Sequence, residues 1–170
     1  DIDVFQHALK WLKKNEDYSP DLVVHLRPTG PARKIDLIDK AIELIASRED
    51  VDSLRSVSLA EQNPFKMWIM NEDETIRPVA ILKNTKDAHS VGRQMLPKAY
   101  WQNGYIDITR PSTVLEKSSM AGDSILPFII QDKINDLDYP EDISIVESAL
   151  KNILDGNNED HEIDTERHPF

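Results

Sequence analysis

The sequence predicts an α/β fold with a mainly parallel sheet covered by helices. Three observations favour this class. Apolar residues recur at helical spacing in separate segments, short apolar runs typical of buried strands lie between those segments, and polar or proline-rich loops separate the two kinds. In such sheets ligands bind beyond the carboxyl ends of the strands, so we expect a functional site in the loops at those ends.

The first part of the chain is predicted as helix, strand, loop and helix. Residues 2–15 carry apolar side chains at helical spacing, and "DLVVHL", residues 21–26, is typical of a short buried strand. "RPTGPAR", residues 27–33, ends that strand in a loop because it contains two prolines and a glycine. Four isoleucines at 3.6-residue spacing predict a second helix: Ile35, Ile38, Ile42 and Ile45.

The rest of the chain supplies further strands and a last helix. The strand candidates are "SLRSVSLA" (53–60), "KMWIM" (66–70), "GYIDITR" (104–110) and "ILPFII" (125–130). Apolar spacing predicts a helix over 143–153, followed by a polar tail. A helix precedes the first strand and no glycine-rich phosphate loop is found, so we interpret the sheet as lacking its first strand.

Composition limits the function. The chain has 170 residues, of which 39% are hydrophobic and 30% charged, as expected for one soluble domain. No apolar run approaches the ~20 residues of a membrane helix and no leader opens the chain, so we expect a cytoplasmic protein without a membrane partner. The net charge of -11 argues against nucleic acid. Without cysteine, a bound metal needs oxygen or imidazole ligands, which favours Mg²⁺.

The acidic segment "INDLDYPED", residues 134–142, has two interpretations. Asp136 and Asp138 stand two residues apart, and in a strand both carboxylates would point to one side, where they could hold Mg²⁺. Alternatively the segment starts a helix, with Asp138 as N-cap, Pro140 in the first turn and Glu141 completing a capping box. The helix start explains Asp138 but leaves Asp136 without a role.

A second acidic segment, "HEIDTE", lies near the C-terminus. Glu162 and Asp164 have the same two-residue spacing, but no strand precedes them and no helix follows. We interpret them, with His161 and His168, as part of a solvated tail.

Two further segments could bind anions or polar ligands. "RPTGPAR" offers Arg27, Thr29, the backbone at Gly30, and Arg33, which suit a nucleotide phosphate; the alternative is a turn with two surface arginines. "GRQMLPKAYWQNGYID", residues 92–107, mixes polar and aromatic side chains that suit a hydroxylated, carboxylated ligand. There the alternative is packing of the aromatic residues and a turn at Asn103-Gly104.

Together, "LVVHLRPTGPAR", "RQMLPKAYWQNGYID" and "INDLDYPEDISIVESAL" resemble, in this order, segments of the acylneuraminate cytidylyltransferase family, the CMP-sialic acid synthetase group. The resemblance covers residues 1–154 and leaves 155–170 as a polar tail. It implies a Rossmann-like (GT-A-like) nucleotidyltransferase fold, a three-layer sandwich with a mainly parallel sheet. It also implies a homodimer that transfers CMP from CTP to an acidic sugar, releasing pyrophosphate with Mg²⁺.

The resemblance also implies roles for single residues. Asp136 and Asp138 match the family's metal-binding aspartates and Asp142 a later one, which favours the metal interpretation of "INDLDYPED" over the tail segment. The remaining implied sites are catalysis by Arg93, Asp136 and Asp138, nucleotide binding by Arg27, Pro28, Thr29, Gly30 and Arg33, and acceptor binding by Arg93, Gln94 and Asn103.

The sequence departs from the family pattern at several positions. Gly30 replaces a serine, Leu137 and Tyr139 replace isoleucine and threonine, and Arg27 stands where the sialic-acid enzymes usually have glutamine. The acceptor sugar can therefore differ from sialic acid. The family's N-terminal strand and basic, glycine-rich loop, which hold the triphosphate, have no counterpart in these residues, so we expect no turnover from the 170 residues alone.

Two other functions remain open. Asp-x-Asp also holds the metal of glycosyltransferases that use nucleotide sugars, which is the alternative within enzymes. A non-catalytic nucleotide-binding or dimerisation module is the alternative outside them.

Overall fold

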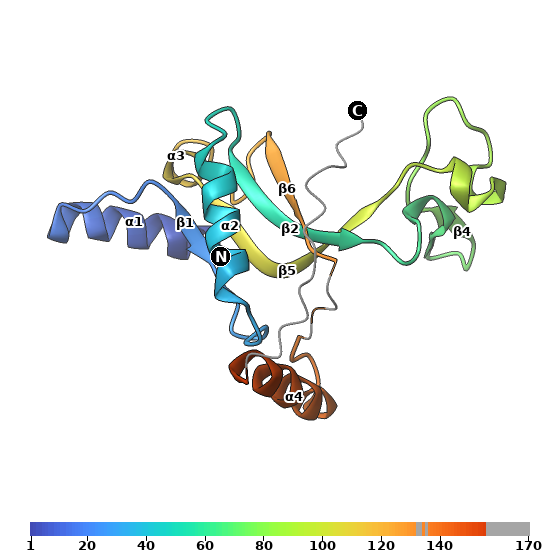
Figure 1. Cartoon of the computed structure of the whole chain (residues 1–170). Coiled ribbons are helices and arrows are strands. Elements are labelled where there is room, and N and C mark those ends of the chain that lie inside the picture. Colours follow the sequence, from blue (N-terminus) through green and yellow to red (C-terminus); the bar gives the residue numbers. More distant parts are fainter. Residues whose placement is uncertain (132–133, 135, 156–170) are drawn as a thin grey trace. The chain divides into compact units, whose positions relative to one another are not determined.

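The computed structural model describes residues 1–131, 134 and 136–155. Its contacts divide the chain into two compact units, of which the first comprises Asp1–Val57 with Gln102–Phe170 and the second Ser58–Trp101. Figure 1 shows the order of the elements along the chain.

The first unit holds most of the regular structure. Its helices are α1 (Ile2–Glu16), α2 (Ile35–Ala46), α3 (Pro111–Leu115) and α4 (Ile143–Leu154), with the short 3₁₀ helix η4 (Pro140–Asp142) before α4. Its sheet is formed by β1 (Val23–His25), β2 (Ser53–Leu59), β5 (Tyr100–Thr109) and β6 (Ile125–Ile129), where β2 and β5 extend into the second unit. The helices predicted over 2–15, from Ile35 and over 143–153 are confirmed, as are the strands at β1, β2, β5 and β6.

The described sheet is mixed, with strand order β1-β5-β2-β6. β1 pairs with β5 antiparallel and β2 pairs with β6 parallel. Hydrogen bonds from Arg110 N–H to Asp52 C=O and from Ala60 N–H to Ala99 C=O join opposite ends of β2 and β5, so these strands also run antiparallel. The α/β prediction is confirmed, but the sheet differs from the mainly parallel one expected, because the chain returns from β2 into β5 without a helical crossover.

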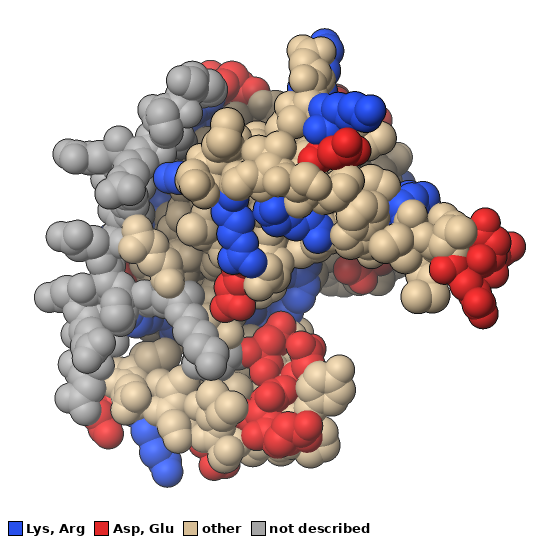
Figure 2. Space-filling view, turned by 90° about the vertical axis from the view of Figure 1, so that its right-hand side faces the viewer, with Lys and Arg blue, Asp and Glu red and all other residues tan. Residues whose placement is uncertain are grey.

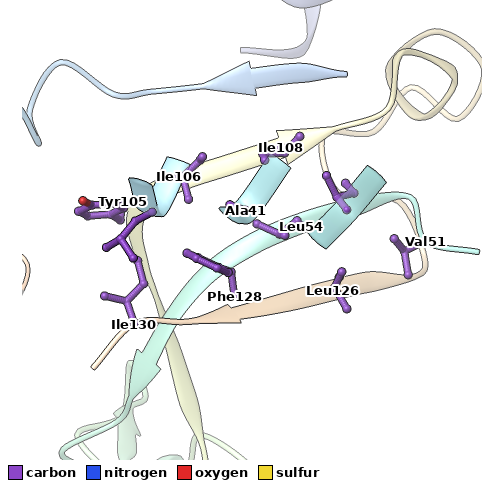
Figure 3. Close-up of a cluster of buried hydrophobic side chains, with 11 residues drawn as sticks. Ala41, Val51, Leu54, Tyr105, Ile106, Ile108, Leu126, Phe128 and Ile130 are labelled. Carbon is purple, nitrogen blue, oxygen red and sulfur yellow. The ribbon is translucent and has the colours of Figure 1, made fainter. Parts of the chain in front are cut away.

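The core lies between α2 and one face of the sheet (Figure 3). α2 begins after the proline-rich loop and turns its apolar stripe inward, burying Leu37, Ala41 and Ile45. The strands contribute alternate side chains to the same cluster, among them Leu54, Ile106, Ile108, Leu126 and Phe128. Burying one such side chain stabilises the fold by about 1.5–3 kcal/mol, so this cluster fixes the sheet that carries the candidate site.

The opposite face of the sheet is polar. Asp107 and Thr109 alternate with the core isoleucines of β5, and Arg55 alternates with the core residues of β2. His25 of β1 lies opposite Asp107 and its ring contacts Phe5 of α1, with centroids 5.1 Å apart. Helices therefore contact both faces of the sheet.

The second unit contains a two-stranded antiparallel sheet and short 3₁₀ helices. Its elements are η1 (Pro64–Lys66), β3 (Trp68–Met70), β4 (Ile76–Pro78), η2 (Ala88–Ser90) and η3 (Arg93–Met95). The strand predicted at 66–70 is confirmed in part, as β3, but it pairs with β4, which the sequence analysis did not predict. None of the described helices has the length and apolar composition of a membrane-spanning helix.

Candidate functional site

Two segments that the sequence analysis singled out meet in the first unit. The backbone N–H of Leu137 donates to the carbonyl oxygen of Thr29 at 2.8 Å. This bond places the loop 27–33 beside Asp136 and Asp138. Burial lowers the pKa of the Arg33 guanidinium, and the charges of Tyr105 and Asp136 act against this lowering.

The loop 27–33 follows β1 and is fixed onto β5 by its two arginines. Arg33 donates from Nε to the carbonyl oxygen of Tyr105 at 2.7 Å and from Nη2 to that of Arg27 at 2.7 Å. Arg27 makes an ion pair with Asp107 at 2.7 Å. The backbone N–H of Gly30 donates to Arg27 C=O at 3.3 Å, which closes the turn, and Pro28 and Thr29 are exposed.

The aspartates of the acidic segment 134–142 differ in their contacts. Asp142 Oδ2 accepts the backbone N–H groups of Asp138 at 3.1 Å and Tyr139 at 2.8 Å, which caps the turn into α4. The capping acid is therefore Asp142, so the helix-start interpretation, with Asp138 as N-cap and Glu141 in the capping box, is wrong by one residue. In Figure 2, acidic side chains gather in the lower part of the view, at the height that α4 has in Figure 1.

Asp136 and Asp138 thus have no capping role. One oxygen of Asp136 accepts the Leu137 N–H at 3.1 Å, and Asp138 is exposed. Within the described residues the Asp138 carboxylate has no recorded hydrogen bond or ion pair. No group of three or more acidic or histidine side chains that could hold a metal was found in the described part of the chain. Residues 136–138 form no strand, so the alignment of the two carboxylates expected from a strand is not observed. Two carboxylates remain a ligand set that Mg²⁺ accepts, because it typically takes one or two from protein and completes its shell with phosphate oxygens and water.

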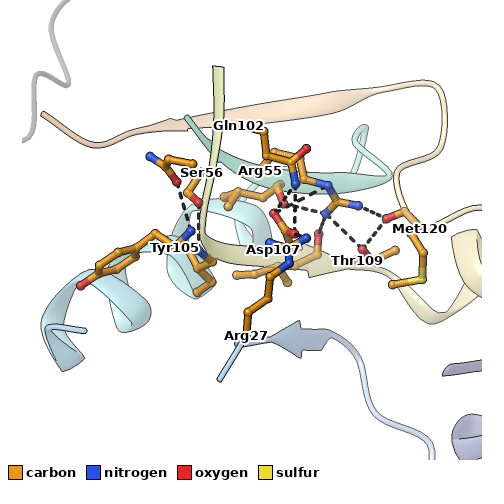
Figure 4. A network of polar contacts seen from close by, with 12 residues as sticks. Arg27, Arg55, Ser56, Gln102, Tyr105, Asp107, Thr109 and Met120 are labelled. Atoms are coloured by element: carbon orange, nitrogen blue, oxygen red, sulfur yellow. Dashed lines mark hydrogen bonds and ion pairs between the residues drawn. The ribbon is translucent and has the colours of Figure 1, made fainter. Parts of the chain in front are cut away.

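A buried network underlies the loop (Figure 4). Asp107, whose side chain is 5% exposed, pairs with Arg27 and lies 3.8 Å from Arg55, and the Gln102 amide donates to both its oxygens at 3.1 Å. Burial lowers the pKa of Arg55 and of His25, and the charge of Arg27 acts in the same direction on both. This network was not predicted from the sequence, although Arg55 and Asp107 are charged residues inside two segments with strand-like patterns.

The acceptor-binding residues predicted from the second segment separate between the units. Arg93 and Gln94 are exposed in the second unit, where Arg93 Nη2 donates to Gln62 Oε1 at 3.2 Å. Asn103 belongs to the first unit and is buried, and its Oδ1 accepts the Tyr105 N–H at 3.1 Å across Gly104, whose φ is +69°. Asn103 and Gly104 lie inside β5, so the turn expected at this pair is not formed, and the bond and the positive φ belong to the strand itself. The acceptor-binding roles stay predictions.

The tail segment with His161, Glu162, Asp164 and His168 lies outside the described residues. In comparisons with known proteins, no family model matches the chain and no curated protein matches it significantly.

Proposed function

We propose that this chain carries the nucleotide and metal site of a cytidylyltransferase, which transfers CMP from CTP to an acidic sugar and releases pyrophosphate. One observation carries the proposal. The Leu137–Thr29 hydrogen bond joins the two segments that resemble the nucleotide loop and the metal aspartates of that family. An arginine-lined loop beside a pair of carboxylates suits a nucleotide phosphate bound with a divalent cation.

The proposed reaction needs a nucleotide site and an acceptor site. The loop at Pro28, Thr29 and Gly30 would contact the cytidine nucleotide. The roles of Arg93 and Gln94 at the sugar carboxylate are proposed from the resemblance alone, since both residues belong to the second unit. The sugar hydroxyl oxygen forms the new bond to the α-phosphorus, the bond to pyrophosphate breaks, and the hydroxyl proton is released. Holding the two reactants in line is the main contribution expected of the protein.

Mg²⁺ is part of the proposal. Asp136 and Asp138 are the residues that would hold it, and the bound ion would offset negative charge on the phosphates. The proposed fold is the Rossmann-like nucleotidyltransferase fold. The parallel β2–β6 pair and the contacts of α1 and α2 with opposite faces of the sheet support it.

The test is a transfer assay with the full-length protein. The protein is incubated with CTP, Mg²⁺ and a sugar acid such as N-acetylneuraminate. The formation of pyrophosphate is measured by ³¹P NMR. Asp138→Asn should abolish turnover, whereas Glu141→Gln, a neutralised exposed acid in the same turn, should retain it. Unchanged turnover of Asp138→Asn would exclude the metal assignment.

We also propose that the protein is a homodimer whose contact includes β3 and β4. A two-stranded sheet is marginally stable alone, and this one exposes large apolar side chains, including Trp68, Ile69, Met70 and Ile76. A second copy would cover them. Sedimentation equilibrium should give a dimer for the wild type and a monomer for Met70→Asp; a wild-type monomer would contradict this assignment.

A glycosyltransferase that uses nucleotide sugars is the second candidate, because Asp136 and Asp138 also form its Asp-x-Asp pattern. Tighter Mg²⁺-dependent binding of UDP-glucose than of CTP would favour it. Binding of neither would favour a non-catalytic module.

A further inference from the structure

On the polar face of the sheet, two arginines share one buried carboxylate. Asp107 lies within ion-pair distance of both Arg27 and Arg55. Arginine is always protonated in proteins. The Asp107 carboxylate therefore balances one of the two guanidinium charges of this trio.

The guanidinium N–H groups of Arg55 and Arg33 donate hydrogen bonds to oxygen atoms of the protein. Arg55 donates to the carbonyl oxygens of Leu54, Ile108 and Met120 and to the hydroxyl of Thr109 (Figure 4). Arg33 donates to the carbonyl oxygens of Tyr105 and Arg27. Both arginines therefore fix the loop and the strands, and their donors are directed at protein oxygens.

Arg27 differs from these two arginines. Its side chain is 35% exposed, and the only recorded partner of its guanidinium among the described residues is Asp107, on Nη2. Nη1 lies over Gly104, where an added Cβ would come within 3.1 Å of it. Asp107 in turn is held by the Gln102 amide. The guanidinium is thus anchored at one end and retains further donors.

We propose that Asp107 is a positioning residue. It holds the guanidinium of Arg27, which the resemblance already places in the nucleotide loop, ready to take a carboxylate or phosphate group of the ligand. This inference deepens the proposed function, on which it rests, by naming the chemistry of a ligand group bound at the loop. A guanidinium fork suits either group because both present two oxygens to it.

Asp107 contributes through orientation. A free arginine side chain loses rotamer freedom when it binds a ligand, and this loss weakens binding. The ion pair with Asp107 and the space above Gly104 place the Arg27 side chain before a ligand arrives. Asp107 also opposes the anion through its own charge, so its two effects on affinity have opposite signs and can be separated.

The experiment is a double-mutant cycle measured by isothermal titration calorimetry with Mg²⁺ present. The variants are Arg27→Gln, Asp107→Asn and the double variant. The probes are CTP, inorganic pyrophosphate and N-acetylneuraminate, which separate a phosphate source from a sugar carboxylate. Arg48→Gln is the matched control, since it removes the same charge from an exposed pair with Asp50.

Arg27→Gln should fold, because Arg55 and Asp107 remain as a one-to-one pair. It should weaken binding of one class of probe, phosphate or carboxylate, by about tenfold or more, the usual range for a charged hydrogen bond. Arg48→Gln should change the affinity less than about twofold, as expected for a screened surface charge. Equal affinities of Arg27→Gln and wild type for every probe would overturn the anion site.

Asp107→Asn tests positioning. It should weaken binding of the same probe about threefold to tenfold in the Arg27 background and leave affinity unchanged in the Arg27→Gln background. Tighter binding in both backgrounds would mean that Asp107 acts only as a charge, and the positioning role would be wrong. Should Asp107→Asn fail to fold, Asp107→Glu, which keeps the charge and shifts its position, takes its place. The double-mutant cycle measures binding and needs no turnover. If binding depends on Arg27 but the protein transfers no CMP, the proposed function is refuted and the inference about Asp107 still holds.

Discussion

The Leu137 N–H and the Thr29 carbonyl oxygen, 2.8 Å apart, join the loop after β1 to the segment that leads into α4. The bond brings Asp136 and Asp138 to the arginine-bearing loop 27–33. Because both segments belong to the first unit, the residues proposed to bind the nucleotide and the metal lie close together within it.

Leu137→Pro tests this connection. Proline has no N–H, so the bond to Thr29 is lost, and we expect the free energy of unfolding to fall by about 1 kcal/mol or more. Mg²⁺-dependent stabilisation by CTP should be lost as well. Leu137→Ala keeps the N–H and should keep the CTP-dependent rise in melting temperature. Equal responses of the two variants to CTP would show that the bond does not hold the site together.

The aspartates of the acidic segment should separate in a stability measurement. Asp142→Ala removes the acceptor of two backbone N–H groups and should lower the free energy of unfolding by about 0.5–2 kcal/mol in urea titrations. Asp138→Ala removes an exposed carboxylate and should change it by less than about 0.5 kcal/mol. The reverse order would assign the structural role to Asp138.

Asp52 should contribute to stability in a pH-dependent way. Its carboxylate accepts from Lys117 Nζ and from the backbone N–H groups of Asp123 and Ser124, which lowers its pKa from 3.8 to about 2. A carboxyl group with a lowered pKa stabilises the fold above its unfolded value, and this contribution is lost as pH falls from about 3.8 towards 2.

The stability difference between wild type and Asp52→Asn should therefore shrink over that pH interval in chemical denaturation. Asp123→Asn serves as control, because its side chain is 91% exposed and its ion pair among the described residues is with the same lysine. A pH-independent difference for Asp52→Asn would contradict the assigned pKa.

Gly122→Ala should be destabilising by about 1–3 kcal/mol or more. Gly122 has φ +70°, and an added Cβ would lie 2.4 Å from the Cβ of Asp52. Gly92→Ala is the control, since its Cβ would make only ordinary contact with Gln94 at a φ of -57°. Urea titration of both variants measures the difference, and similar stabilities would show that the turn at Gly122 adapts.

Much of the fold was predictable because the helices depend on local spacing. The apolar periods of α1, α2 and α4 are visible without tertiary information. The direction of the strands was not predictable from the sequence. The segment between β2 and β5 has no apolar periodicity that would distinguish a helical crossover, which gives parallel strands, from a connection that gives antiparallel strands. β4, "IRP", is too short and too exposed to stand out.

The site was predictable in its segments and not in its contacts. Thr29 and Asp136 were found from short patterns, whereas the pairing of Arg27 with Asp107 joins residues far apart in sequence. Asp142 illustrates a local error, since the capping acid stands one residue after the predicted Glu141. A one-residue shift is within the uncertainty of helix boundaries.

The most direct test of the central claim is calorimetric titration of this chain with CTP, UTP and UDP-glucose, each with and without Mg²⁺. We predict one site that prefers CTP, requires Mg²⁺ and is lost in Asp138→Asn but retained in Glu141→Gln. Preference for UDP-glucose, or CTP binding that ignores both Mg²⁺ and Asp138, would contradict the cytidylyltransferase site.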